Sequence, residues 1–226
     1  MLAFSSPACS LTHLLLNHLP LIHLYLSHLK RIALFASGSG SNAEKIADYF
    51  TDNPDVEVTL ILSNNPKAGV IDRSRRGFGR GLHVPVLLFD RTTFYNTDRI
   101  TKLLQSQQID LIVLAGFMWL MPTKLVQAFP NQIVNIHPAL LPKFGGKGMY
   151  GHFVHEAVVA AGETESGITI HFVNEHYDEG QVIFQASCPV SNIDSPEDVA
   201  HKVQVLEHEH YPRVVDELLQ SMNRIS

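Results

Sequence analysis

The sequence predicts an α/β fold: one domain with a mostly parallel, twisted sheet flanked by helices and an antiparallel pair of C-terminal strands. From residue 30 onward, short apolar runs alternate with stretches of helical spacing, which is the order that builds a parallel sheet. The 226 residues are 45% hydrophobic and 17% charged, which fits one domain with a substantial core. The last two apolar runs, 168–173 and 182–186, have no helix between them, so they can pair antiparallel.

Strands and helices alternate through most of this region. The first apolar run is followed by a tight turn of Ser, Gly and Asn at 37–42. Residues 111–115 are apolar without interruption, which is typical of a strand buried on both faces. The predicted strands here are 32–36, 56–62, 84–88, 111–115 and 133–136, and the predicted helices are 43–50, 69–78, 93–105 and 122–129.

Glycines and prolines mark the remaining elements. A glycine-rich loop at 143–151 precedes a predicted helix at 153–161. The last helix opens at Asp194-Ser195-Pro196-Glu197, which supplies a cap, a proline and an acid in the first turn. We expect it to run to Leu219, with Pro212 kinking or breaking it.

The first 29 residues follow a different pattern. Four histidines recur every five residues, each followed by Leu: His13, His18, His23 and His28. A period of five fits neither a helix nor a strand, and the stretch lacks the features of a signal peptide or a membrane span. We expect residues 1–29 to be a disordered or non-native leader, with a metal-binding histidine tract as the alternative. The folded domain is then expected to cover residues 30–226.

Composition excludes several classes of protein. The formal net charge is −5, and no basic stripe with interleaved aromatic residues indicates nucleic-acid binding. Two cysteines, Cys9 and Cys188, do not form a disulfide framework and favour a reducing cytoplasm. The remaining histidine pairs lack the spacing of a zinc motif, so we predict no metal. These pairs are His152 with His155 and His208 with His210.

The stretch Asn135-Ile136-His137-Pro138 carries the strongest chemical signal. Two residues apart on a strand, the Asn135 amide and the His137 imidazole point to the same face. They stand at the carboxyl end of the strand, where open α/β sheets place their active sites. A hydrogen-bond donor beside a titratable group suits acyl transfer, which must hold an oxyanion and move a proton. A satisfied polar pair at a strand end is the alternative.

The turn at 37–42 predicts a phosphate site. Gly38 and Gly40 let the backbone approach a ligand closely, and the following helix offers free N–H groups to an anion. The turn lacks both the dinucleotide spacing and the P-loop lysine, which leaves a monophosphate. An ordinary turn with Asn42 as a helix cap is the alternative.

Three other features are candidates for the site. A carboxylate at Asp178, if it lies near His137, would raise the histidine pKa and favour the imidazolium form; a plain turn aspartate is the alternative. The apolar stretch 115–122 could form a wall for a flat heterocycle or simply pack in the core. Gln204 and Glu207 share a face of the last helix, which could equally be solvated.

Taken together, residues 30–221 resemble the phosphoribosylglycinamide formyltransferases. The matching stretches are 35–42, 63–64, 114–118, 135–143, 170–173, 177–180 and 204–208 with Tyr211 and Pro212.

The resemblance implies a formyltransferase (Rossmann-like) fold with a catalytic domain at 30–226. It implies transfer of the formyl group of 10-formyltetrahydrofolate, as co-substrate, to the amine of N1-(5-phosphoribosyl)glycinamide in de novo purine biosynthesis, without a metal. The implied partners are these small molecules, without nucleic acid or membrane. The enzyme is expected to be a cytoplasmic monomer or homodimer.

Site residues carry over by position from the resemblance. The implied catalytic residues are Asn135, His137 and Asp178, with His171 in support. The implied phosphate and ribose site is Gly38, Ser39, Gly40, Ser41, Asn42, Gln204 and Glu207. The implied folate site is Phe117, Met118, Trp119, Leu120, Met121, Asn135 and Lys143. In the expected mechanism, Asn135 and a protonated His137 donate to the formyl oxygen, and Asp178 keeps the histidine charged.

Two positions depart from the family pattern. Trp119 stands where many relatives carry Arg, which is expected to weaken an ion pair to the folate glutamate tail. The loop at 144–151 also differs from its commoner form.

Other formyl-folate enzymes are alternatives to this reading. Methionyl-tRNA formyltransferase would need a C-terminal RNA-binding domain, and formyltetrahydrofolate hydrolase an N-terminal regulatory domain; we expect neither. A sugar-amine formyltransferase and a non-catalytic nucleotide-binding module are the further alternatives.

Overall fold

A computed structural model describes residues 29–222 and confirms the predicted fold class. Seven strands form one sheet in the order β3-β2-β1-β4-β5-β6-β7. The first five in this order run parallel, and β6 and β7 are antiparallel to their neighbours. The strands are β1 Lys30–Phe35, β2 Val56–Ser63, β3 Val86–Leu88, β4 Leu111–Leu114, β5 Ile133–His137, β6 Glu165–Phe172 and β7 Val182–Pro189. The helices are α1 Ser41–Phe50, α2 Gly69–Arg76, α3 Arg91–Asn96, α4 Arg99–Ser106, α5 Thr123–Ala128, α6 His152–Ala160 and α7 Pro196–Met222.

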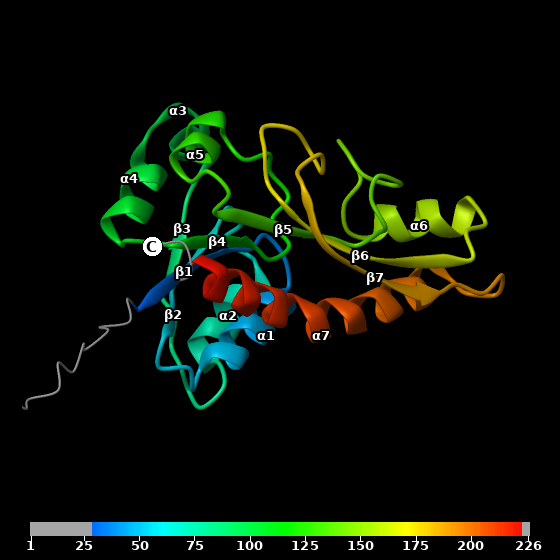
Figure 1. Cartoon of the computed structure of the whole chain (residues 1–226), viewed down its shortest axis with the longest axis horizontal. Helices are drawn as coiled ribbons and strands as arrows, with labels where there is room; N and C mark the ends of the chain where they lie inside the picture. The colour runs from blue at the N-terminus through cyan, green and yellow to red at the C-terminus, as the bar shows by residue number, and fades with distance from the viewer. Residues whose placement is uncertain (1–28, 223–226) are drawn as a thin grey trace, which may run out of the picture.

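Helices cover both faces of the sheet (Figure 1). Helices α3, α4 and α5 gather on one side, where apolar residues such as Phe94 and Leu125 join one buried cluster. Helices α1, α2 and α7 lie on the other side, where Ile46, Val70 and Val215 belong to a second cluster. Helices cover both faces of the sheet at β1, β4 and β5. These strands are therefore largely apolar instead of alternating between apolar and polar residues.

The strand order reverses between β1 and β4, which is where open α/β sheets bind ligands. The chain leaves β1 and β4 at the same edge, and the two following loops are hydrogen-bonded together. The Ser37 N–H donates to the Gly116 carbonyl at 3.1 Å, and the Met118 N–H donates to Ser37 Oγ at 3.3 Å. The predicted phosphate turn and the predicted apolar wall therefore begin side by side.

The helix predicted at 93–105 is two helices, α3 and α4, and the single-helix prediction is wrong. Thr97 has extended backbone angles. Its hydroxyl donates to the Thr93 carbonyl at 2.7 Å and accepts from the Arg99 N–H at 3.3 Å. A Thr side chain that bonds the backbone in this way competes with the helix ladder, which ends α3 and starts α4.

Helix α7 continues through Pro212. Of the two expected outcomes, a kink or a break, the break is therefore wrong, and the kink stays a prediction. Proline has no backbone N–H, so one hydrogen bond of the helix is lost at Pro212. Burial of neighbouring side chains offsets this loss. Tyr211 is completely buried, and its hydroxyl donates toward the carbonyls of Leu114 at 3.0 Å and Val134 at 3.3 Å. The helix is therefore fastened to the middle of the sheet where the proline occurs, and packing overrides local propensity.

Candidate active site

A cavity of about 620 Å³ lies at the carboxyl ends of β1, β4 and β5. It is bounded by the turn after β1, the segment after β4, the glycine-rich loop, the β6–β7 turn and α7. Of the predicted site residues, sixteen line this cavity and Lys143 does not. The sixteen are Gly38, Ser39, Gly40, Ser41, Asn42, Phe117, Met118, Trp119, Leu120, Met121, Asn135, His137, His171, Asp178, Gln204 and Glu207.

The centre of the cavity brings His137 and Asp178 together, which sequence alone could not show. His137 Nδ1 lies 3.5 Å from Asp178 Oδ2, and both side chains are almost wholly buried. Asp178 sits in the β6–β7 turn with φ of +57°, a left-handed conformation that Asp tolerates better than most residues. The Gly146 N–H donates to Asp178 Oδ2 at 2.9 Å, so the glycine-rich loop holds the carboxylate in place.

The second ring nitrogen of His137 is committed to the backbone. Nε2 lies 2.8 Å from the Phe144 carbonyl oxygen, which can only accept, so Nε2 carries a proton. In the neutral ring, Nδ1 is then the unprotonated atom and faces Asp178 and the cavity. The Phe144 carbonyl therefore fixes which nitrogen of His137 is available for proton transfer.

Burial lowers the pKa of His137 below its usual value, and it outweighs the opposite effects of Asp178 and of the Phe144 carbonyl. The predicted effect of Asp178 is confirmed, because its charge raises this pKa, but the predicted imidazolium form is wrong. The side chain is only 4% exposed, and desolvation disfavours the charged form. The pKa of Asp178 is lowered: burial would raise it, but His171, His137 and the Gly146 N–H together favour the ionised form. The pair therefore combines a neutral imidazole with a carboxylate.

Asn135 and His171 form the adjacent polar pair. They are partners across the β5–β6 ladder, and Asn135 Nδ2 lies 3.2 Å from His171 Nε2. His171 Nδ1 donates to the Phe172 carbonyl at 2.9 Å, and Nε2 lies between the Asn135 amide and Asp178 Oδ1, which is 3.6 Å away. His171 thus contacts the Asn135 amide beside His137, and its supporting role stays a prediction.

One end of the cavity is formed by the turn before α1. Gly40 has φ of +78°, and a Cβ there would lie 2.5 Å from Val70 Cβ, so glycine is required by the fold. Gly38 has open space where a Cβ would project. Asn42 Nδ2 donates to Glu207 Oε2 at 3.0 Å, which joins the turn to α7. Burial raises the pKa of Glu207, and the hydrogen bond from Asn42 opposes that rise.

The other end of the cavity has an apolar wall that also belongs to the core. Phe117 and Met121 are buried in the aromatic cluster around Phe35, whereas Met118 is 47% exposed. Trp119 packs edge-on against Phe89, with ring centroids 6.1 Å apart. The core-packing interpretation therefore holds for Phe117 and Met121, and the ligand-wall interpretation stays a prediction for this cavity-lining segment.

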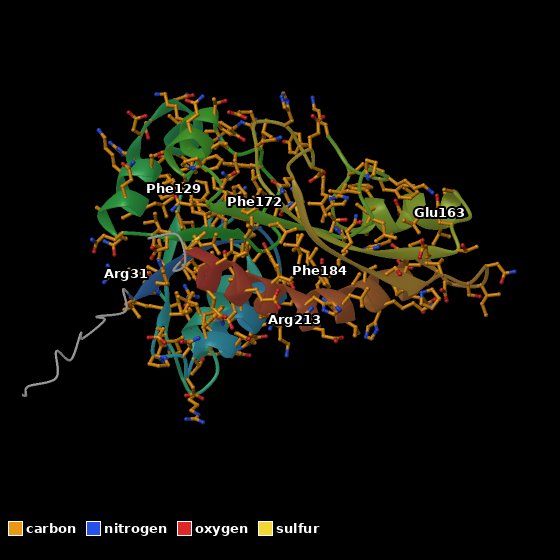
Figure 2. All side chains as sticks on the ribbon, in the orientation of Figure 1. Arg31, Phe129, Glu163, Phe172, Phe184 and Arg213 are labelled. Carbon is orange, nitrogen blue, oxygen red and sulfur yellow. The ribbon has the colours of Figure 1, made fainter. Side chains whose placement is uncertain are left out.

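Lys143 does not line the cavity, and its predicted contact with the folate stays a prediction. Its Nζ lies 2.8 Å from Glu163 Oε1. Glu163 is labelled in Figure 2 at the far end of α6. The ion pair holds the start of the glycine-rich loop, and the later part of that loop faces the cavity.

Sequence reasoning missed the contribution of α6 to the cavity. His152 and His155 line it, together with Tyr150 and the loop lysine Lys147. His155 is buried, and its Nδ1 has no hydrogen-bond partner among the described residues. The signal was their spacing of three after a glycine-rich loop, which places both rings on one helix face. Within residues 29–222, no group of three or more His, Cys, Asp or Glu is placed to hold a metal.

Comparisons with known proteins decide the family. Residues 30–215 match the family model described as formyl transferase. The chain is 35% identical over 200 residues to the phosphoribosylglycinamide formyltransferase of Bacillus subtilis (strain 168), which covers 86% of this chain and 97% of that protein. The chain belongs to the phosphoribosylglycinamide formyltransferase family.

Solved structures of the family share the fold. Glycinamide ribonucleotide transformylase 1 from Geobacillus kaustophilus superposes with a TM-score of 0.74 at 37% identity, covering 85% of this chain and all (100%) of that one. The chloroplastic phosphoribosylglycinamide formyltransferase of Arabidopsis thaliana is 41% identical over 192 residues, or 82% of this chain. The chain spans 64% of the length of that plant relative.

Proposed function

We propose that this chain transfers the formyl group of 10-formyltetrahydrofolate to the amine of N1-(5-phosphoribosyl)glycinamide, a step of de novo purine biosynthesis. The observation that carries the proposal is the placement of Asn135, His137 and Asp178 between two unlike ends of one cavity. One end offers backbone N–H groups before α1 and the Asn42–Glu207 pair, which suit a phosphorylated sugar. The other end offers an apolar wall, which suits a reduced pterin.

Asn135 stabilises the charge that develops during acyl transfer. As the amine attacks the formyl carbon, the carbonyl oxygen becomes negative, and the Asn135 amide donates to it. Removing one such donor costs about 3–4 kcal/mol of transition-state stabilisation in comparable sites. His171 supports this by fixing the orientation of the amide across the ladder.

His137 moves the proton. Its neutral Nδ1 accepts the proton that the attacking amine loses, and Asp178 stabilises the imidazolium so formed. His137 then returns that proton to the folate nitrogen as the carbon–nitrogen bond to it breaks. The proton count balances without a metal or a covalent enzyme intermediate. The protonated histidine of the earlier expectation thus becomes an intermediate state rather than the starting one.

We also propose the extent and setting of the enzyme. The catalytic domain begins at residue 30, and the predicted leader at 1–29 lies outside the described residues except for Leu29. We predict that the enzyme is a cytoplasmic monomer or homodimer and that it binds no nucleic acid. Among residues 29–222, no helix is both long and apolar enough to cross a membrane. The relatives in Arabidopsis thaliana and Vigna unguiculata are named as chloroplastic proteins.

Formyl transfer with purified protein tests the proposal. The release of tetrahydrofolate from 10-formyltetrahydrofolate is followed with and without N1-(5-phosphoribosyl)glycinamide, and the formylated ribonucleotide is identified by mass spectrometry. We expect release only when the ribonucleotide is present. Release without it would indicate a hydrolase, and transfer only to a sugar amine or to methionyl-tRNA would indicate the other formyltransferases. Ribonucleotide binding without turnover would indicate a nucleotide-binding module.

A further inference from the structure

Helix α2 packs directly against the phosphate turn, residues 37–42. A Cβ at Gly69 would lie 2.9 Å from the Ser39 carbonyl oxygen, so the first turn of α2 touches this carbonyl. The close approach of Gly40 to Val70 lies beside it. Ser39 and Gly40 line the cavity, whereas no residue of α2 does. The turn therefore lies between the cavity and α2.

The Arg73 side chain of α2 holds the Ser39 carbonyl. Its Nε–H donates to the Ser39 oxygen at 2.8 Å, and its Nη1 pairs with the Glu44 carboxylate in the first turn of α1. The side chains of Arg73 and Glu44 are only 27% and 28% exposed. Hydrogen bonds that involve a charged group are stronger than those between neutral groups. One guanidinium thus joins the turn firmly to the helix that follows it.

A second side chain holds a neighbouring carbonyl of the turn. Asn65, which lies between β2 and α2, donates from Nδ2 to the Ser37 carbonyl at 3.0 Å. Its Oδ1 accepts from the Lys67 N–H at 2.9 Å, and its own N–H donates to Ser63 Oγ at 3.3 Å. The Asn65 amide is therefore fixed on both sides. The segment after β2 binds two carbonyl groups of the phosphate turn.

The direction of these carbonyls determines where the N–H groups of the turn point. In a trans peptide, a carbonyl and the N–H of the next residue point in opposite directions. Because the Ser39 carbonyl points to Arg73, the Gly40 N–H points to the opposite side of the turn, where the cavity lies. A carbonyl rotated into the cavity would instead present an oxygen, which can only accept, to the anion. Anion binding by this turn therefore depends on how its peptides are held.

Resting on the proposed function, we propose that Arg73 is a positioning residue for the phosphorylated substrate, because it holds the Ser39 carbonyl away from the cavity and so keeps the Gly40 N–H directed at the phosphate. Asn65 assists by holding the Ser37 carbonyl. Neither Arg73 nor Asn65 lines the cavity, so both act through the turn and not by touching the substrate. The affinity for the ribonucleotide then depends on a side chain outside the site, and the affinity for the folate does not.

The effect of Arg73→Met on the two substrates tests this inference. Methionine keeps an unbranched apolar stem and loses every donor. We expect KM for N1-(5-phosphoribosyl)glycinamide to rise about 10-fold, the lower end of what a hydrogen bond to a charged group contributes. KM for 10-formyltetrahydrofolate and kcat should stay unchanged, and Asn65→Ala should give a smaller rise in the same KM. Equal shifts of both KM values would show a general disturbance of the fold and contradict the inference.

Control variants separate the bond to the carbonyl from the charge. Glu44→Gln breaks the same ion pair but leaves the bond from Arg73 to Ser39, so it should not raise KM for the ribonucleotide. Arg75→Met removes an arginine of the same helix that is 76% exposed and pairs with Asp72 at 3.3 Å, and it should change neither KM. When Arg73→Met is combined with Glu44→Gln, the net charge of the pair is kept, and the raised KM should persist. A rise in Glu44→Gln equal to that in Arg73→Met, or a normal KM in the double variant, would refute the positioning role.

Binding without turnover distinguishes this inference from the proposed function. Calorimetric titration should show that the unmodified chain binds ribose 5-phosphate more tightly than ribose, and Arg73→Met should remove most of this difference. A protein that behaves in this way but transfers no formyl group contradicts the proposed reaction and retains the role of Arg73. An active enzyme in which Arg73→Met leaves the difference unchanged contradicts the role of Arg73 alone. Equal binding of both sugars by the unmodified chain would contradict the phosphate turn and this inference with it.

Discussion

His137 Nδ1 faces Asp178 Oδ2 at 3.5 Å while His137 Nε2 donates to the Phe144 carbonyl at 2.8 Å. The backbone contact determines which nitrogen is free, and the carboxylate determines what happens when that nitrogen gains a proton. Because burial lowers the pKa of His137, the ring is neutral before the reaction begins. The site is thus arranged to accept a proton at one defined atom, close to the Asn135 amide.

The three central side chains should affect turnover much more than binding. We expect Asn135→Ala, His137→Ala and Asp178→Asn each to lower kcat by at least about 100-fold, because each acts mainly in the transition state. Steady-state kinetics with both substrates saturating gives kcat, and calorimetry gives the affinities. Turnover close to that of the unmodified enzyme in the His137 or Asp178 variant would refute the proposed proton transfer.

The two glycines of the phosphate turn should differ in effect. Gly38→Ala places a methyl group in open space at the cavity, so we expect a higher KM for the ribonucleotide, an unchanged KM for the folate and a normal melting temperature. Gly40→Ala forces a side chain into a positive φ and against Val70. That change should cost about 1–3 kcal/mol of folding stability. Equal shifts of both KM values in Gly38→Ala would show that the turn is not a substrate site.

Tyr211→Phe tests how α7 is fastened to the sheet. The Tyr211 hydroxyl is fully buried between the carbonyls of Leu114 and Val134. Its removal should lower the free energy of unfolding by about 1–2 kcal/mol, because two buried acceptors lose a partner. Denaturant unfolding measures this difference. The exposed Tyr49→Phe, which loses one bond to Asp216, is the matched control and should change stability little.

A chain that begins at Leu29 should keep full turnover and thermal stability, because residues 1–28 carry no patterned apolar face. Thermal melts of the two chains, with and without added zinc, check this. Stabilisation by zinc that occurs only in the longer chain would instead support the histidine tract as a metal site.

The sheet was predictable because its central strands are short apolar runs separated by helical spacing, a pattern that has few other solutions. The predictions at Thr97 and Pro212 were wrong for different reasons. At Thr97 a side-chain bond to the backbone decides the structure, and at Pro212 partners distant in sequence decide it. Thr97 broke a helix through its hydroxyl, and buried Tyr211 held a helix together across a proline.

The site was predictable where its residues lie on one strand, as Asn135 and His137 do, or within one turn. The sign of the His137 pKa shift was not predictable, because it depends on how deeply the ring is buried after folding.

The pH dependence of kcat tests the central claim most directly, because a neutral His137 and a protonated one give opposite slopes. We predict that kcat rises as pH increases through a pKa below 6.5, the usual value, and is level above it. Since Asp178 raises the pKa of His137, Asp178→Asn should move this rise to lower pH as well as lowering its height. A kcat that falls as pH increases through neutrality, or a rise that Asp178→Asn leaves in place, would contradict the account.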